Sequence, residues 1–581
     1  MIAALILWYA YLPAVSFNFF DSITFYGMVF ALLLASVVSY FKKDNKTAER
    51  YYMAIFIIGI AVIGAIGVIS ILYQMGVAVF SYDRLYSQLG KVEKKVYVEE
   101  ITPIDLSQVP YVDEEYAKIL GEKTLGKEED LGSRVTIGEF AMQEVDGKLV
   151  LVAPLEHKDF FKYLKNREGT PGYIMISASN SEDVKLVTEL DGKPLKIKYQ
   201  MGAYLGEDLK RHIRNEGFWS EGLTEFTFEL DHSGRPYWVV TTYKNTIGFD
   251  IPEAVGTIVV DAQTGETQKY SIEETPDWVD IIQPKEFVAN QIENWGKYVH
   301  GIFNFDDKDK VKATEGMDTI YNDGNCYYYT GITSYSSDTS TNGFILVNTR
   351  TKEAIKYNLT GGHENAAQES AEGEVQNMNY TAGFPLPVNL DGIPTYFMPL
   401  KDKAGYVKKF AFVNIEYIQR VAIGDSIIAA KNAYVAEMSA SGNNIAFTDD
   451  AYSMEKEGTI ARISFTMLDG GSTVYMFTLE GEKEIYQISP NLSTEVILTE
   501  PGDQIKFTCV DDQNGNITVT TFENSAVYSK KSEAQIKVDE EAERVNTEQN
   551  KVIDVNPEED QKKWESLTDE ERAKLLDSLN D

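Results

Sequence analysis

The residues best suited to chemistry are acidic side chains and a few histidines, and the clearest pair is His363 with Glu364 in the loop GGHENAAQES. An imidazole beside a carboxylate can hold and transfer a proton. A second polar loop with glycines, EGTPGYIMIS from Glu168, is another place where a pocket could form. We expect structural roles for both loops, because neither matches a known catalytic pattern.

Neighbouring carboxylates offer a second kind of chemistry, since two acids can act as general acid and general base. Glu114 with Glu115, and Asp250 near Glu253, are such pairs. The chain has 89 acidic residues, so pairs of this kind arise by chance. We therefore predict no catalytic residue.

Metal ligands are also not indicated. Asp306, Asp307 and Asp309 in FDDKDK suggest calcium, but the glycine and closing glutamate of an EF-hand loop do not fit, which predicts a solvated acidic turn. Cys326 and Cys509 lie far apart and are expected to be buried thiols. No two histidines have the i, i+4 spacing of a helical zinc site; they are His157, His212, His232, His300 and His363. We expect no metal site, no cofactor and no cofactor-binding residue.

Charge and motifs narrow the function further. A formal net charge of -35 repels phosphate backbones, so nucleic acid is not an expected partner. The sequence contains no P-loop, no G-x-S-x-G, no H-E-x-x-H and no C-x-x-C. The balance favours a protein that is not an enzyme.

The N-terminal region predicts an integral membrane protein. Its apolar runs fit three transmembrane helices over residues 2–20, 22–41 and 53–80. A cleavable signal peptide is the alternative for the first run, but the basic residues that precede such a peptide are missing. Basic residues in the short link predict that it faces the cytoplasm and that the body is extracytoplasmic; they are Lys42, Lys43, Lys46 and Arg50. The lipid bilayer is then a partner and the cell membrane the location.

Four copies of one pattern follow, each with a turn glycine, a strand, a loop and a second strand. The first strands follow the glycines Gly147, Gly234, Gly324 and Gly392, and the second strands begin near Gly172, Gly256, Gly343 and Gly405. The turn glycines are expected to supply the positive φ that tight hairpins need. Helices predicted between copies, at 206–214, 276–300 and 364–376, indicate α+β units.

The second copy carries a family resemblance. Its segments GRPYWVV and VVDAQTGETQKY resemble the PepSY module, whose hairpin has the pattern V-D-x-x-T-G-E. The matching residues are Val260, Asp261, Thr264, Gly265 and Glu266. The third copy keeps part of the pattern, with Asn348 for the Asp and Lys352 for the Gly. We expect Asp261 and Thr264 to cap a turn in which Gly265 is left-handed. The resemblance implies extracytoplasmic protein binding or restraint of peptidases, and it supplies no catalytic residue.

The C-terminal part changes character. Five short strand-like runs between residues 448 and 525 predict a small barrel resembling an OB fold. Its aromatics Tyr475, Phe477, Tyr486 and Phe507 are expected to form the core. Residues 532–581 predict an acidic, largely disordered tail. The full predicted order is a transmembrane region (1–80), a connector (81–140), repeats at 141–230, 231–310 (PepSY-like), 311–385 and 386–440, the barrel and the tail.

The predicted fold class is therefore a membrane-anchored α+β protein with tandem PepSY-like repeats and an OB-like barrel. The whole chain also resembles bacterial membrane-anchored proteins without an assigned activity. We expect a non-enzymatic binding or scaffold protein whose partners are other proteins of the membrane or envelope. Two alternatives stay open: an envelope hydrolase or peptidase regulator with a site built from distant loops, and an accessory subunit of a membrane complex. The sequence leaves the oligomeric state open.

Overall fold

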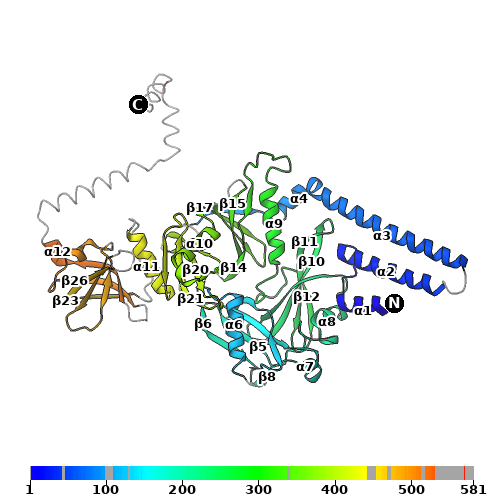
Figure 1. The fold of residues 1–581 in the computed structure, drawn as a ribbon, viewed down its shortest axis with the longest axis horizontal. Helices are drawn as coiled ribbons and strands as arrows, with labels where there is room; N and C mark the ends of the chain where they lie inside the picture. The colour runs from blue at the N-terminus through cyan, green and yellow to red at the C-terminus, as the bar shows by residue number, and fades with distance from the viewer. Residues whose placement is uncertain are drawn as a thin grey trace. The chain divides into compact units, whose positions relative to one another are not determined.

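The structure is a computed structural model, shown in Figure 1. It describes residues 2–41, 46–97, 109–128, 131–145, 147–322, 324–335, 340–390, 392–440, 453–467, 473–490, 492–511, 517–529 and 568. The predicted tail, 532–581, therefore lies outside the described residues except for Thr568. The chain forms two compact units, Met1–Thr448 and Asp449–Asp581. Each is described by itself.

The larger unit begins with four helices: α1 (Ile2–Tyr11), α2 (Phe20–Phe41), α3 (Lys46–Phe80) and α4 (Tyr82–Ser87). Helices α2 and α3 lie side by side (Figure 1). Helix α1 stops early because Leu12 takes a positive φ of 44° and Pro13 follows it. Its 10 residues reach only about 15 Å.

The predicted transmembrane region is wrong. Among the described residues, no helix is both long enough and apolar enough to cross a membrane. The first predicted span, 2–20, is broken at Leu12, and the ends of the next two helices pack on the body. Phe19 stacks edge-on against Tyr243 at 5.2 Å between ring centres, and Val77 is buried. This finding contradicts the predicted membrane location and the topology inferred from it.

Four sheets make up the rest of the larger unit, and we number them in chain order. The first contains β2 (Val135–Ile137), β3 (Ala141–Val145), β4 (Lys148–His157), β5 (Tyr173–Ser177) and β6 (Asn180–Val187), with α6 (Glu114–Leu125) and α7 (Phe160–Lys165). A short pair, β7 (Glu189–Leu190) with β8 (Lys193–Pro194), and the 3-10 turn η2 (Leu205–Glu207) follow. The second sheet is preceded in the chain by α8 (Leu209–Asn215). Its strands are β9 (Gly222–Leu230), β10 (Pro236–Ile247), β11 (Ile251–Asp261) and β12 (Thr267–Tyr270).

The third and fourth sheets have the same plan. The third contains α9 (Lys285–Lys297), β13 (Val311–Ala313), β14 (Asp318–Asn322), β15 (Asn325–Ser334), β16 (Ser340–Asn348), β17 (Ala354–Gly362) and the distant β1 (Val92–Val96). The fourth contains α10 (Glu364–Glu374), η3 (Gln376–Met378), β18 (Thr381–Ala382), β19 (Leu386–Leu390), β20 (Ile393–Lys401), β21 (Val407–Asn414), β22 (Val421–Gly424) and α11 (Ile427–Ala440). The protein is thus mostly β, and the predicted membrane-anchored α+β class is wrong.

One hydrogen bond recurs in all four sheets. The N–H just beyond the second hairpin strand donates to the carbonyl two residues after the turn glycine: Ala178 to Leu149 (2.9 Å), Ala262 to Pro236 (3.2 Å), Thr349 to Cys326 (3.1 Å) and Ile415 to Pro394 (3.2 Å). The turn glycines all have positive φ, as predicted: 76° at Gly147, 80° at Gly234, 74° at Gly324 and 87° at Gly392. The four hairpins therefore share one register.

A second repeated bond ties each hairpin to the helix before it. The carbonyl of the residue beyond the second strand accepts main-chain N–H groups from the segment that leads into that helix. The bonds run from Tyr111 and Val112 to Ala178, from Lys198 and Tyr199 to Ala262, from Ile282 and Gln283 to Thr349, and from Gly362 to Ile415, all at 2.8–3.0 Å. Each helix thus belongs to the hairpin that follows it.

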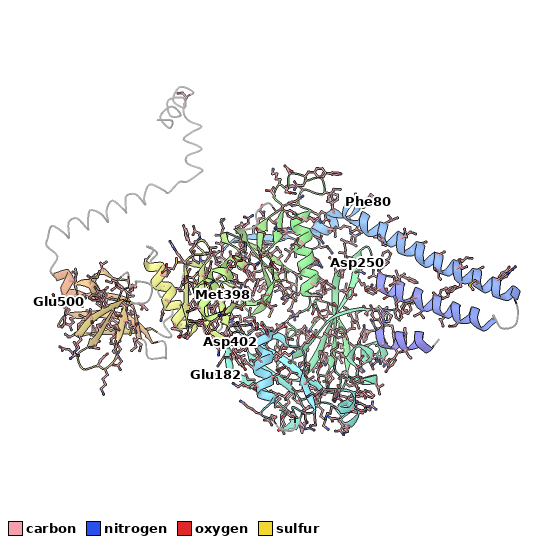
Figure 2. The ribbon with its side chains drawn as sticks, viewed as in Figure 1. Phe80, Glu182, Asp250, Met398, Asp402 and Glu500 are labelled. Atoms are coloured by element: carbon pink, nitrogen blue, oxygen red, sulfur yellow. The ribbon has the colours of Figure 1, made fainter. Side chains whose placement is uncertain are left out.

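Strands β4 and β20 are buried along most of their length because both faces of their sheets are covered. In β4, Leu149 and Leu151 pack with α6, whereas Val150 and Val152 pack with the second sheet. In the fourth sheet Met398, which is labelled in Figure 2, packs with residues of α10, and Phe397 packs with residues of α11. The hydrophobic cores are therefore layers between successive elements.

Strand β1 closes an edge of the third sheet. It pairs in parallel with β17, with Val92 opposite Ala354 and Val96 opposite Asn358. Tyr97, the next residue, is 1% exposed and packs edge-on against Phe344 at 5.0 Å between ring centres. The segment after α4 thereby joins a sheet built more than 200 residues later.

The smaller unit is a closed barrel of five strands in the order β23-β24-β25-β27-β26. Phe477, Tyr486 and Phe507 are buried in it, so their predicted core position is confirmed. The elements are β23 (Ser453–Met467), β24 (Thr473–Leu479), β25 (Tyr486–Ile488), η4 (Thr494–Leu498), β26 (Gln504–Asp511), β27 (Ile517–Asn524) and α12 (Ser525–Ser529).

Gly343 lies inside β16, beside the irregularity in its pairing with β17, and has a φ of 131°; a side chain there would overlap the carbonyl oxygen of Tyr357. We expect Gly343→Ala to lower the free energy of unfolding by about 1–3 kcal/mol, measured by thermal melting. The matched control is Gly373→Ala in α10, where nothing lies within 4 Å of the added methyl group. It should leave the melting temperature unchanged or raise it. Equal melting temperatures for the two variants would contradict the strained geometry.

Candidate functional site

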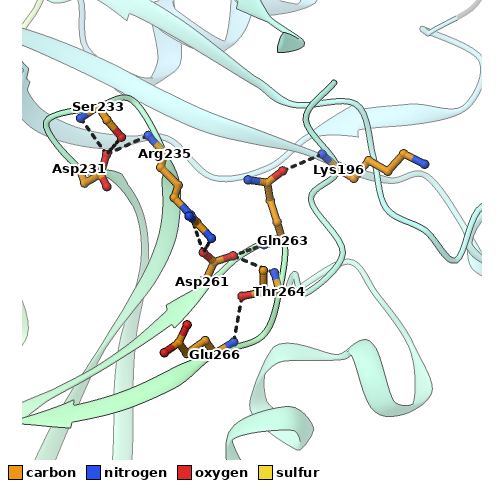
Figure 3. Close-up of polar contacts among 8 residues, drawn as sticks. All are labelled: Lys196, Asp231, Ser233, Arg235, Asp261, Gln263, Thr264 and Glu266. Carbon is orange, nitrogen blue, oxygen red and sulfur yellow. Dashed lines mark hydrogen bonds and ion pairs between the residues drawn. The ribbon is translucent and has the colours of Figure 1, made fainter. Parts of the chain in front are cut away.

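The turn after β11 carries the PepSY-like residues, and Figure 3 shows its polar contacts. Asp261 Oδ1 accepts hydrogen bonds from the N–H groups of Gln263 (2.9 Å) and Thr264 (2.7 Å). Its Oδ2 accepts from Nε of Arg235 at 2.6 Å (Figure 3). Gly265 has φ of 80°, so the predicted capping by Asp261 and the left-handed glycine are confirmed.

The third sheet builds the same turn from a different sequence. Asn348 Oδ1 accepts from the N–H groups of Arg350 (2.9 Å) and Thr351 (2.8 Å). Lys352 has φ of 66° and stands where Gly265 stands in the second sheet. An amide oxygen replaces the carboxylate without loss of the turn. The resemblance therefore rests on residues that hold a hairpin together.

Charged side chains from the first three sheets interact with Lys285, the first residue of α9. Glu114, Glu225 and Asp318 each interact electrostatically with Lys285. They come from α6, β9 and β14. We name this set the Lys285 cluster, and its further members are Asp113, Glu139 and Lys401.

Glu225 reaches the cluster because of a β-bulge. It is the extra residue of β9 opposite β10, and its φ of 44° is unusual for a residue with a side chain. The main-chain N–H of Lys285 favours the charged form of the Glu225 carboxylate and so opposes the rise of its pKa. Pro284 precedes α9 and offers no capping side chain, so Glu225 stabilises this helix end from a distant strand.

Burial raises the pKa values of the cluster's carboxyl groups. The pKa of Glu114, of Glu225 and of Asp318 is raised mainly because each group is partly removed from water. Lys285 opposes the shift in all three. Carboxyl groups with raised pKa values beside an amine are candidates for proton transfer.

Lys401 links the cluster to the fourth sheet. Its amino group is nearly buried and pairs with Asp113 and, at 3.6 Å, with Glu115. Asp113 also caps α6 by accepting from the N–H of Tyr116 at 2.9 Å. The neighbours Glu114 and Glu115 thus have separate cationic partners, and the structure does not bring them together as an acid and base pair.

A second set of acidic side chains lies where the first three sheets meet. Glu229 accepts from Oγ1 of Thr227 (2.7 Å) and from the N–H of Asp280 (3.1 Å), and Asp280 accepts from the N–H of Glu144 (2.6 Å). Burial raises the pKa of Glu229 to about 8 and that of Asp280 to about 6. Burial, with these acids nearby, also raises the pKa of the Cys326 thiol, which makes the thiol unreactive.

The acidic turn at residues 306–309 is exposed, as predicted. Asp307 pairs with Lys310 at 2.6 Å and Asp309 with His300 at 2.8 Å. Among the described residues, no group of three or more His, Cys, Asp or Glu side chains could hold a metal ion.

The remaining sequence candidates are placed apart from one another. Glu168 pairs with Lys196, and Glu253 with Lys352 at 3.6 Å. His363 caps α10, because its Nδ1 accepts from the N–H of Ala366 at 3.2 Å. Glu364 points into the core, where its Oε1 accepts from the hydroxyl of Tyr329 at 2.7 Å. The two side chains of this pair therefore have different roles.

The Lys285 cluster could not be found from sequence. Its members come from residues 113 to 401, and each looks like an ordinary surface charge in its own segment. No sequence pattern marked them, because no helix was predicted at Glu114 and the predicted helix at 276–300 begins well before Lys285. Only the contacts between sheets make those positions neighbours.

Comparisons with known proteins do not assign a family. No protein-family model matches the sequence, and no curated protein matches it. Among solved structures 16 chains match. A B. megaterium levansucrase variant is 10% identical over 75% of this chain and 94% of that one, with a TM-score of 0.17. A glycosyl hydrolase from Bacteroides ovatus is 11% identical over 58% and 80%, with a TM-score of 0.16. The match to yeast Stn1 and Ten1 is 13% identical, spans 20% of this chain and only 62% of that one, and has a TM-score of 0.11. TM-scores this low carry no argument about function.

Asp261→Ala removes an acceptor of two main-chain N–H groups, so we expect it to lower the free energy of unfolding by about 1–3 kcal/mol. Asp261→Asn should cost much less, because Asn348 serves the equivalent turn. The reciprocal Asn348→Asp is the matched control and should be tolerated. Chemical denaturation of the three variants measures this. If Asp261→Ala and Asp261→Asn lower the free energy of unfolding equally, the ion pair with Arg235, and not the capped turn, supplies the stabilisation.

The buried acids predict a pH dependence of stability. Because the folded pKa of Glu229 is about 8 and that of Asp280 about 6, the folded state binds more protons than the unfolded state above about pH 4.5. Stability from these groups is therefore lost as the pH rises towards 8. We expect Glu229→Gln to flatten the fall of melting temperature between about pH 5 and pH 8. Glu182→Gln, at an exposed site on β6, should leave the wild-type slope; an unchanged slope in Glu229→Gln would refute the assignment.

Proposed function

We propose that the protein is a non-enzymatic binding or scaffold protein that presents PepSY-like units and binds another protein through helices α2 and α3. The observation that carries this is the apolar surface of the two helices. Ile58, Ile69 and Leu72 of α3 are each more than 60% exposed, and Phe80 at its end is 86% exposed (Figure 2). Large exposed apolar surfaces mark interaction sites.

The body is suited to hold such a surface in a fixed place. The core of the first sheet includes Cys326 from the third sheet and has Tyr406 and Val407 of the fourth packed against it. The ion pair between Lys401 and Asp113 crosses the same boundary. The sheets therefore support one another instead of moving separately, as a scaffold requires.

The chemistry of the two helices indicates what kind of partner fits. Between Tyr51 and Phe80 the sequence has no charged residue, and the side chains are mainly Ile, Val, Ala and Gly. A partner gains affinity here by burying apolar area of its own, at about 25 cal/mol per Å². An apolar helix or strand of another protein has that character.

A hydrolase is the second candidate, and the Lys285 cluster is the observation that favours it. Carboxyl groups with raised pKa values beside an amine are the components of general acid and base catalysis. They are drawn from distant segments, as a site assembled from loops would be. Turnover of an ester, amide or glycoside that Lys285→Met abolishes without loss of folding would favour this candidate over the first.

The scaffold proposal is tested by photo-crosslinking from position 58 in the full-length chain, expressed in its own cells. We expect one adduct of defined mass, because a specific partner covers this face. The double change Ile58→Asp and Ile69→Asp should abolish an adduct formed from Leu72 while leaving the melting temperature of the body unchanged, since both side chains are exposed.

The control places the same crosslinker at Glu182, an exposed residue of β6. It should give no such adduct. The same adducts from both positions, or adducts that survive the two Asp substitutions, would contradict the proposal.

A further inference from the structure

Glu364 is a fully buried carboxylate that is only partly satisfied. It is the first residue of α10, its side chain is 0% exposed, and Oε1 accepts from the hydroxyl of Tyr329 at 2.7 Å. Oε2 makes no hydrogen bond within the described structure. A buried carboxylate with an unmet oxygen is costly, so something is needed to offset its charge.

The groups around Glu364 offer oxygen atoms. Two further buried hydroxyls, those of Tyr97 and Thr314, also lack a hydrogen-bond partner within the described structure. Tyr329 and Tyr396 interact electrostatically with Glu364 and with Tyr97, so their hydroxyls lie in the same region. We name these five residues the Glu364 oxygen cluster.

No cationic side chain balances the cluster. Among the described residues, no lysine, arginine or histidine forms an ion pair with Glu364. Its neighbours are phenol and alcohol groups, which are neutral. The cluster thus combines one carboxyl group, which is a carboxylate when a cation is bound, with several oxygen donors in a site closed to water.

We propose that the Glu364 oxygen cluster binds one monovalent cation, of the sodium or potassium type. Hard cations prefer carboxylate, hydroxyl and carbonyl oxygens, which is the donor set present here. One carboxylate neutralises the charge of a monovalent cation, whereas a divalent cation would keep one unit of positive charge without a buried negative partner. The cation would connect the third sheet, α10 and the segment after β1, because Tyr329, Glu364 and Tyr97 come from these three parts.

The backbone preserves the space that this requires. A side chain at Gly331 in β15 would clash with both carboxylate oxygens of Glu364 and with Oγ1 of Thr314. The Glu364 carboxylate therefore lies directly over the strand, with Thr314 beside it. Glycine at this position is explained by the room the oxygens occupy.

Thermal melting of the full-length protein tests the proposal. The melting temperature is compared in sodium, potassium and choline chloride at equal ionic strength. A bound cation stabilises the folded state by mass action, so sodium or potassium should raise the melting temperature by at least about 2 °C over choline, with saturation. Equal melting temperatures in all three salts would overturn the proposal.

Variants assign the effect to the cluster. Glu364→Gln keeps the shape and removes the charge, so the difference between the salts should disappear. Tyr97→Phe should shift the saturation to a higher salt concentration. Glu369→Gln, at an exposed position of the same helix, is the matched control and should keep the wild-type difference. A difference that persists in Glu364→Gln would overturn the proposal.

A direct measurement covers the case in which Glu364→Gln does not fold. Sodium NMR line broadening by the wild-type protein should be reversed by potassium, because both ions compete for one site. The broadening should be unchanged in Glu369→Gln and weaker in Tyr97→Phe. Broadening that potassium does not reverse, or none at all, would overturn the proposal.

Discussion

Four carbonyl groups hold the larger unit together: those of Ala178, Ala262, Thr349 and Ile415. Each belongs to a residue whose own N–H closes a hairpin, and each accepts from the segment that leads into a helix. A buried carbonyl without a partner is costly, so this pair of bonds fixes where the helix starts relative to the sheet. In the first, third and fourth sheets the helix begins two residues after the last bonded N–H, whereas in the second sheet α8 begins at Leu209, further along the chain from Tyr199.

The same constraint places the charges. Glu114, Lys285 and Glu364 are the first residues of α6, α9 and α10, and each follows the bonded N–H of its segment by two residues. They occupy one position of a repeated arrangement. In the first two cases that position faces neighbouring sheets and forms the Lys285 cluster. In the third it faces the core, because Gly331 leaves room for a carboxylate.

Local features were predictable from sequence, and long-range ones were not. The positive φ of Gly147, Gly234, Gly324 and Gly392 follows from turn chemistry, and α10 begins at Glu364, where the predicted helix at 364–376 begins. The predicted helix at 276–300 begins only at Lys285, because Ile282 and Gln283 use their N–H groups on Thr349.

The membrane prediction was wrong because apolar composition reports neither the break at Leu12 nor the packing of helix ends on the body. The Lys285 cluster depends on contacts between sheets, which no single segment encodes. The PepSY-like relationship stays a prediction that rests on the turn at Asp261. That turn is structural, so the residues that carry the resemblance are separate from those of the candidate site.

Strand β1 has a consequence for how the protein is made. Its residues, Val92–Val96, pair with Ala354–Asn358, and the ion pair between Asp113 and Lys401 spans a still longer stretch. A nascent chain emerges from the ribosome at about 5–20 residues per second, so the early segments wait many seconds for their partners. Until the fourth sheet emerges, the surface of α6 that Tyr406 covers is bare. The larger unit therefore completes its fold late in synthesis, and a chain stopped before residue 401 would leave α6 uncovered and Asp113 without the partner Lys401.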